Sequence, residues 1–302
     1  MVQNQHIGGK HVHTEQKSKS SLRRLGEALL YSSIFISFCA FSLTIVTYKL
    51  AGLPVSLPMA LFIFLATLFT YNLSSIYSVF RRPGQKISDT DAHWTQINRK
   101  PLALLGLISV VTGAFIYFYF SFGINIWFML HLAFISIGYT IPIVYKSKRV
   151  KPLRNIPLLK VFLIAYVWAV VTTLFPLLEA GFDIREKEAL ILLARRFLFI
   201  LSLALLFDVR DFSYDRSMNT LTVPGLVGVN NTKFISLALL VIYTITSLQT
   251  ETGLVQLALL ASAIGAGLVV VFSSEDRPRL YYLLFADGAM LLHSGLVLLT
   301  LM

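Results

Sequence analysis

Nine long apolar segments, bounded by charged residues or by Gly and Pro, constrain the fold of this 302-residue chain most strongly. A helix needs about 20 apolar residues to cross the hydrocarbon core of a bilayer. Only helices and closed barrels satisfy every backbone polar group in lipid, and the sequence lacks the alternating pattern of a barrel. We therefore expect an all-α, polytopic membrane protein with nine transmembrane helices. The expected spans are residues 29–47, 57–80, 101–122, 125–145, 157–178, 190–208, 233–249, 254–272 and 279–301.

The composition agrees with a chain whose outer surface faces lipid. Hydrophobic residues make up 56% of the sequence and charged residues only 14%, whereas soluble domains carry about 25% charged residues. The single cysteine, Cys39, excludes a framework of disulfides within the chain. We expect residues 1–28 to form a disordered basic tail and residues 29–302 to form one transmembrane domain, because the spans leave no room for a separate soluble domain.

The distribution of Lys and Arg predicts the orientation in the membrane. Of 26 basic residues, twenty lie in the N-terminal tail and in the loops that follow the even-numbered spans. Only Lys49, Arg185 and Lys187 fall in the loops of the other side. Cytoplasmic loops carry the excess of positive charge, so the N-terminus and the basic loops are expected in the cytoplasm. The net charge of +11 is then a topology signal, and we expect no nucleic-acid partner.

Three aspartates follow one another at the end of the sixth expected span. Asp208, Asp211 and Asp215 are spaced i, i+3 and i+7, which places them along one face of a helix. Like charges stacked in this way repel one another, and a divalent cation removes that cost. Carboxylate oxygens are the ligands that Mg²⁺ prefers, usually together with substrate phosphates. The alternative is an ordinary solvated helix end in which acidic and basic residues alternate.

The segment from Asp208 to Pro224 resembles the second aspartate-rich motif of the UbiA superfamily of intramembrane prenyltransferases. That motif has the form D-x-x-D, a further D and then a T-L-P-V-like segment. A second resemblance lies in Tyr139-Thr-Ile-Pro142 and the basic stretch after it, which is similar to the family's Y-S-x-P pattern. The resemblance implies nine transmembrane helices and a Mg²⁺-dependent prenyltransferase that acts on a polyprenyl diphosphate.

The resemblance also implies roles for individual residues. The expected metal ligands are Asp208, Asp211 and Asp215, with Asp89 and Asp91 as further candidates. The expected catalytic residues are Asn72, Asp208, Asp211 and Asp215. The residues expected to bind the diphosphate are Arg210, Tyr139, Lys146, Lys148, Arg154 and Lys160.

The family's first motif, N-x-x-x-D with another Asp soon after, is incomplete in this chain. Asn72 is kept, but Ile76 and Phe80 stand where the carboxylates would fall. The nearest acids are Asp89 and Asp91 in the following loop. The site then has fewer metals, is completed by the loop acids, or is inactive.

Several charged residues have simpler explanations. Positive-inside anchoring explains the basic residues after the fourth span equally well. Lys160 lies within a span, where a charge normally faces a cavity, and a snorkelling lysine is the alternative. Asp287, about two turns into the last span, is expected to face the interior and to pair with a base. Arg195 and Arg196 are expected to snorkel to the opposite membrane surface.

The leading hypothesis is a UbiA-like prenyltransferase of the bacterial inner membrane that transfers a polyprenyl group to a lipophilic acceptor. A terpene cyclase of the same superfamily would instead trap the carbocation within the donor chain. A lipid-binding pseudoenzyme of this fold would bind without turnover. A transporter is disfavoured because the sequence shows no internal repeat with interrupted helices.

Overall fold

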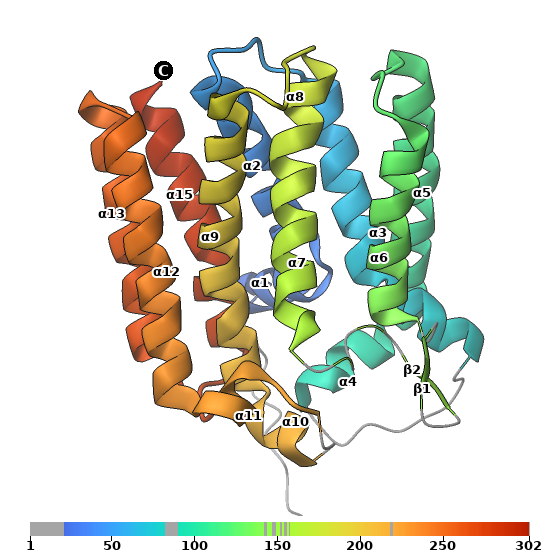
Figure 1. The fold of residues 1–302 in the computed structure, drawn as a ribbon. Helices are drawn as coiled ribbons and strands as arrows, with labels where there is room; N and C mark the ends of the chain where they lie inside the picture. Colours follow the sequence, from blue (N-terminus) through green and yellow to red (C-terminus); the bar gives the residue numbers. More distant parts are fainter. Residues whose placement is uncertain are drawn as a thin grey trace, which may run out of the picture.

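The computed structural model describes residues 21–81, 90–141, 144–146, 149–151, 153, 156, 158–217 and 220–301. Long helices run side by side and form a single bundle (Figure 1). Within the described residues, seven helices are long and apolar enough to cross a membrane. The chain is therefore a multi-pass helical membrane protein. The seven candidate spans are Leu57–Tyr77, Arg99–Phe120, Leu159–Glu179, Lys187–Arg210, Val229–Thr250, Gly253–Phe272 and Arg279–Thr300.

The remaining two expected spans correspond to shorter helices. α2 (Ile34–Leu50) has 17 residues and α6 (Ile126–Thr140) has 15. Both are apolar, but each is shorter than the roughly 20 residues of a typical span. The predicted class of fold is confirmed, whereas the predicted count of nine full-length spans is not.

The long helices of the bundle begin and end close to the expected boundaries. Five of them are uninterrupted α-helices, namely α3, α5, α9, α12 and α13. Two spans are composite, because a π-helical turn joins two α-helical pieces in each. The bounds are α3 (Leu57–Arg81), α5 (Arg99–Phe120), α7 (Leu159–Ala169) with α8 (Phe175–Glu179), α9 (Lys187–Arg210), α12 (Val229–Thr250), α13 (Gly253–Phe272), and α14 (Arg279–Tyr281) with α15 (Asp287–Thr300).

The N-terminal region differs from the expectation of a disordered tail over residues 1–28. α1 (Ser21–Tyr31) is helical, so the last eight residues of that tail belong to the fold. The chain then breaks at Ser33, whose φ of 68° lies in the left-handed region. Because a helix cannot continue through such a residue, α2 begins at Ile34 rather than at the expected residue 29.

Short elements lie at one end of the bundle, which we call the α10 end (Figure 1). They are α4 (Thr90–Ile97), α10 (Phe212–Ser217), α11 (Val223–Val227) and a hairpin of two short strands. In the hairpin β1 (Val144–Lys146) pairs with β2 (Arg149–Lys151) in antiparallel register. The hairpin is a short addition to an otherwise helical fold. It forms because the fourth span ends at Thr140, so that the last residues of the predicted span 125–145 pair with a second strand.

The π-helical turn in the fifth span has an identifiable cause. The turn covers Val170–Leu174 and is followed by Pro176. Proline has no backbone N–H and cannot bond the carbonyl four residues before it. That carbonyl, of Thr172, instead accepts a hydrogen bond from Thr47 Oγ1 at 2.7 Å. The break in one helix is thus satisfied by a side chain of α2.

Close packing between α3 and α5 depends on small residues. Gly106 of α5 faces α3, and a Cβ atom placed there would lie 3.0 Å from Ile76 Cδ1 and 3.2 Å from Asn72 Cβ. Gly113, two turns further along, leaves more room, with Leu65 Cβ at 3.7 Å. Small residues let membrane helices approach closely, which is the main source of packing energy where lipid removes the hydrophobic drive.

Candidate functional site

The three predicted aspartates meet at the α10 end of the bundle. α9 ends at Arg210, and α10 begins two residues later. The backbone hardly departs from a helix between them, since Asp211 N donates to Phe207 O and Asp215 N donates to Asp211 O at 2.8 Å. The i, i+3, i+7 spacing therefore keeps the three carboxylates on one face, across the boundary between the two helices.

Lys160 lies at the centre of these carboxylates. Its Nζ atom is 2.9 Å from Asp208 Oδ1, 3.3 Å from Asp215 Oδ2 and 3.6 Å from Asp211 Oδ2. The lysine lies in the first turn of α7. The start of this helix is hydrogen-bonded to the segment that follows α10, because Leu158 N donates to Leu221 O. The side chain of Lys160 is 14% exposed, so it is held inside the protein and does not snorkel to the surface.

Arg210 forms a second, two-point ion pair with the cluster. Its Nε donates to Asp211 Oδ1 at 2.7 Å, and its Nη2 donates to Asp211 Oδ2 at 2.9 Å. The guanidinium also lies over the rings of Phe207 and Tyr282, at 5.1 Å and 5.8 Å from their centroids. Bidentate pairing combined with stacking fixes the orientation of an arginine. Tyr282 is fully buried.

Burial differs among the three carboxylates, and their electrostatics differ with it. Asp208 is almost completely buried, whereas the Asp211 side chain is 29% exposed. Burial alone would raise the pKa of Asp211, but the hydrogen bonds and charge of Arg210, with the charge of Lys160, lower that pKa below its usual value. Asp211 is thus held as a carboxylate at neutral pH.

The donor set of this aspartate cluster suits a hard cation. All the donors are carboxylate oxygens, which Mg²⁺ prefers, and Lys160 and Arg210 offset only two of the three negative charges. In addition, Asp208 Oδ1 is buried without a regular hydrogen bond among the described residues. Lys160 Nζ nevertheless lies at the point that the carboxylates share, and the described part of the chain holds no group of three or more acidic, His or Cys side chains arranged around a metal.

Asn72 has contacts of a different kind. It is buried in α3, and its Nδ2 donates to Ser32 O at 3.1 Å and to Leu68 O at 2.9 Å. Ser32 lies at the break between α1 and α2. Within the described residues Asn72 makes no hydrogen bond to the aspartates, so the structure gives it a clear role in holding the N-terminal break, and its catalytic role stays a prediction.

The structure describes the other predicted site residues to different extents. Tyr139, half-buried near the end of α6, interacts electrostatically with Lys160. Asp91 lies in α4 and Lys146 in β1, both at the α10 end, but their side chains are outside the described part. Lys148, Arg154 and Asp89 lie outside the described residues altogether.

Two further groups inside the bundle, Trp168 and Asp287, are not among the predicted site residues. Trp168 of α7 donates from Nε1 to the Tyr71 hydroxyl of α3 at 3.2 Å and so links two helices. Asp287 is buried at the start of α15, and its backbone carbonyl accepts from Cys39 Sγ. No basic side chain of the described residues lies within ion-pair distance of the Asp287 carboxyl, contrary to the expected pairing. Only the position of an acid inside an apolar span pointed to this residue.

A comparison with solved structures places the fold beside a membrane enzyme. The chain is similar to a structure of digeranylgeranylglyceryl phosphate synthase, a synthase in membranes, with a TM-score of 0.50 and 14% sequence identity. The alignment covers 92% of this chain and 97% of that one, so the likeness extends over the whole bundle. No protein-family model matches the chain, and no curated protein matches it in sequence. The comparison establishes a shared fold.

Proposed function

We propose that this chain is a UbiA-like membrane prenyltransferase that moves a prenyl group from a diphosphate donor to a lipophilic acceptor. The observation that carries the proposal is the convergence of three aspartates and two basic side chains at one end of a bundle with this fold. A diphosphate needs both cationic partners and, in this family, metal held by carboxylates. The α10 end of the bundle supplies both kinds of residue.

The proposed reaction breaks the bond between C1 of the prenyl chain and the diphosphate oxygen. The diphosphate leaves with the electron pair, and the resulting allylic carbocation accepts an electron pair from the acceptor, which then loses a proton. Bound Mg²⁺, held by Asp208, Asp211 and Asp215, would neutralise the charge on the leaving group. Lys160 and Arg210, already oriented by the carboxylates, would bind diphosphate oxygens.

The proposed location is the bacterial inner membrane with the α10 end in the cytoplasm. Two observations support it: Arg149, Lys151, Arg210 and Arg216 belong to described elements at that end of the bundle, and α3 and α9 both end there. This end is where a diphosphate donor made in the cytoplasm would place its polar head while its prenyl chain stays in the bilayer.

Turnover in detergent or nanodiscs tests the proposal. Purified protein is incubated with a panel of prenyl diphosphates, and diphosphate release is measured with Mg²⁺ and with EDTA. We expect release that depends on Mg²⁺, and its loss on Asp211→Asn, because helix α3 carries no carboxylate that could hold the ion instead. Asp276→Asn is the matched control, since Asp276 is an exposed acid at the same end. Equal release in EDTA would refute the mechanism.

The incomplete first motif favours a second candidate, a pseudoenzyme that binds prenyl lipids without turnover. Ile76 occupies the position of a carboxylate, and Lys160 fills the shared centre of the remaining acids. Diphosphate binding that is unchanged by Asp211→Asn and by removal of Mg²⁺ would support this candidate. Release of diphosphate from the donor alone, with a cyclised product, would instead support a terpene cyclase.

A further inference from the structure

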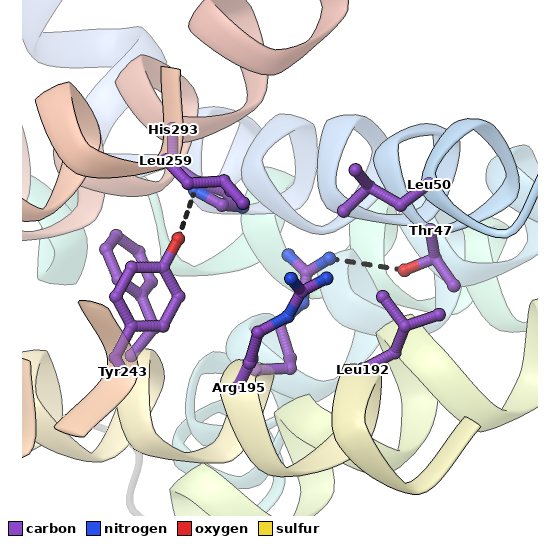
Figure 2. Close-up of a pocket in the computed structure, with 9 residues that line it drawn as sticks. Thr47, Leu50, Leu192, Arg195, Tyr243, Leu259 and His293 are labelled. Carbon is purple, nitrogen blue, oxygen red and sulfur yellow. Dashed lines mark hydrogen bonds between the residues drawn. The ribbon is translucent and has the colours of Figure 1, made fainter. Parts of the chain in front are cut away.

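A second polar group of residues lies inside the bundle, toward the end opposite the aspartates. Arg196 of α9 is twelve residues before Asp208, so about 18 Å of helix separates the two. Its guanidinium borders a small cavity between α2, α9, α12, α13 and α15. Figure 2 shows side chains of these helices converging there, with Arg195, Tyr243 and His293 around the space. Thr47 and Leu50 of α2 line the other side.

The guanidinium of Arg196 is buried without full compensation. Arg196 is 6% exposed and Arg195 is 4% exposed, so the expectation that both snorkel to the membrane surface is wrong. Arg196 Nη2 donates to Leu43 O and to Thr47 Oγ1, each at 3.2 Å. Its Nη1 has no hydrogen-bond partner among the described residues. A buried donor left unsatisfied costs on the order of 1–3 kcal/mol, and more for a charged group.

The charges around the cavity do not balance. Arg195 pairs with Glu251 at 2.8 Å and donates to Thr250 Oγ1 at 2.9 Å. No carboxylate of the described residues lies within 4 Å of Arg196. The neighbouring Tyr243 hydroxyl and His293 Nδ1 contact each other at 3.3 Å and supply no negative charge. Glu251 therefore neutralises Arg195 alone, and the positive charge of Arg196 remains without a carboxylate partner among the described residues.

The size of the cavity limits what can neutralise this charge. Its volume is about 20 Å³, which is room for roughly one water-sized particle. A water molecule would satisfy Nη1 but would leave the charge, while a phosphate or a lipid headgroup is too large for the space. We propose that the cavity beside Arg196 binds a single halide-sized anion, with chloride as the expected ion and Nη1 as its principal donor.

The test measures the thermal stability of the purified full-length protein in sodium chloride and in sodium gluconate at equal ionic strength. An ion that binds only the folded state raises Tm with concentration, and gluconate is too large to enter. We expect chloride and bromide, but not gluconate, to raise Tm saturably. Arg196→Met should abolish the difference between the salts. Arg185→Met, which removes an exposed arginine at the same end, should keep it.

A second variant keeps the test decisive if Arg196→Met fails to fold. Glu251→Gln retains Arg196 and removes the carboxylate that neutralises Arg195, so the chloride concentration at half-effect should fall about tenfold, equivalent to about 1.4 kcal/mol. Equal Tm values of the wild type in chloride and gluconate would overturn the proposal in favour of bound water. An unchanged half-effect concentration in Glu251→Gln would overturn it as well. Neither result bears on the aspartates, which lie at the other end of α9.

Discussion

At the scale of single residues, Lys160 has the largest influence on the aspartate cluster. Its ammonium group is the shared partner of three carboxylates, one of which is almost completely buried. Removing one member of a buried ion pair leaves an uncompensated charge, which typically costs about 3–5 kcal/mol. The same removal would clear the central position for another cation.

We predict that Lys160→Met lowers Tm markedly in EDTA and that added Mg²⁺ restores part of the loss. Both effects follow from three carboxylates that need a positive partner. Lys233→Met is a suitable control, because Lys233 donates to the carbonyls of Val271 and Ser273 and to no carboxylate. A Mg²⁺ response that is equal in the two variants would contradict a cation site at the cluster.

The pairing of Asp211 with Arg210 predicts a pH dependence. The folded state lowers the pKa of Asp211, so its carboxylate stabilises the protein fully above the unfolded pKa of about 3.9. That contribution is lost as the pH falls below this value toward the lower folded pKa. In Tm measurements between pH 6 and pH 3, the wild type should therefore lose more stability than Asp211→Asn. Parallel pH profiles of the two proteins would show that the pair contributes nothing.

At the scale of elements, the interface between α3 and α5 gives the sharpest expectation. Gly106→Ala should lower Tm, because the new Cβ would press on Asn72 Cβ, which is fixed to the α3 backbone. Overpacking of this kind costs about 1–3 kcal/mol. Gly113→Ala meets its neighbours at ordinary contact distance and should leave Tm unchanged or slightly higher. Equal losses at both positions would mean that helix spacing does not depend on Gly106.

The sequence was a good guide to the long elements and a poor guide to their interruptions. Hydropathy located the spans within a few residues, because lipid demands continuous apolar helices. It missed α1, the break at Ser33 and the hairpin, since these depend on tertiary contacts. The break at Ser33, for example, is held by the side chain of Asn72 from another helix. Pro176 was visible in the sequence, but Thr47, whose Oγ1 donates a hydrogen bond to the carbonyl of Thr172, was not.

The candidate site was predictable in the same partial way. The spacing of Asp208, Asp211 and Asp215 indicated a shared face, and the charge pattern placed them at the end of the bundle that carries the basic loops. The central position of Lys160 could not be read from the sequence, because a lysine one turn inside a span is compatible with either snorkelling or pairing. The same ambiguity hid the burial of Arg196.

At the scale of the whole molecule, the two ends of the bundle should lie on opposite sides of the membrane. The single native cysteine, Cys39, is completely buried, so engineered cysteines can be labelled without background. Glu186→Cys and Arg216→Cys introduce exposed thiols at opposite ends. With a membrane-impermeant maleimide, we expect Glu186→Cys to react in spheroplasts and Arg216→Cys to react only after lysis. The reverse pattern would invert the proposed orientation.

The charges along α9 also have a consequence for the order in which the chain assembles during synthesis. Arg195 and Arg196 lie in its first half and Asp208 near its end, and none of them is stable alone in lipid. Lys160 belongs to the preceding span and is therefore synthesised before Asp208. Glu251, the partner of Arg195, follows only after α12. Asp208 at the end of α9 can therefore form its ion pair first. Arg195 near the start of α9 has no carboxylate partner until α12 has been inserted and Glu251 has followed it.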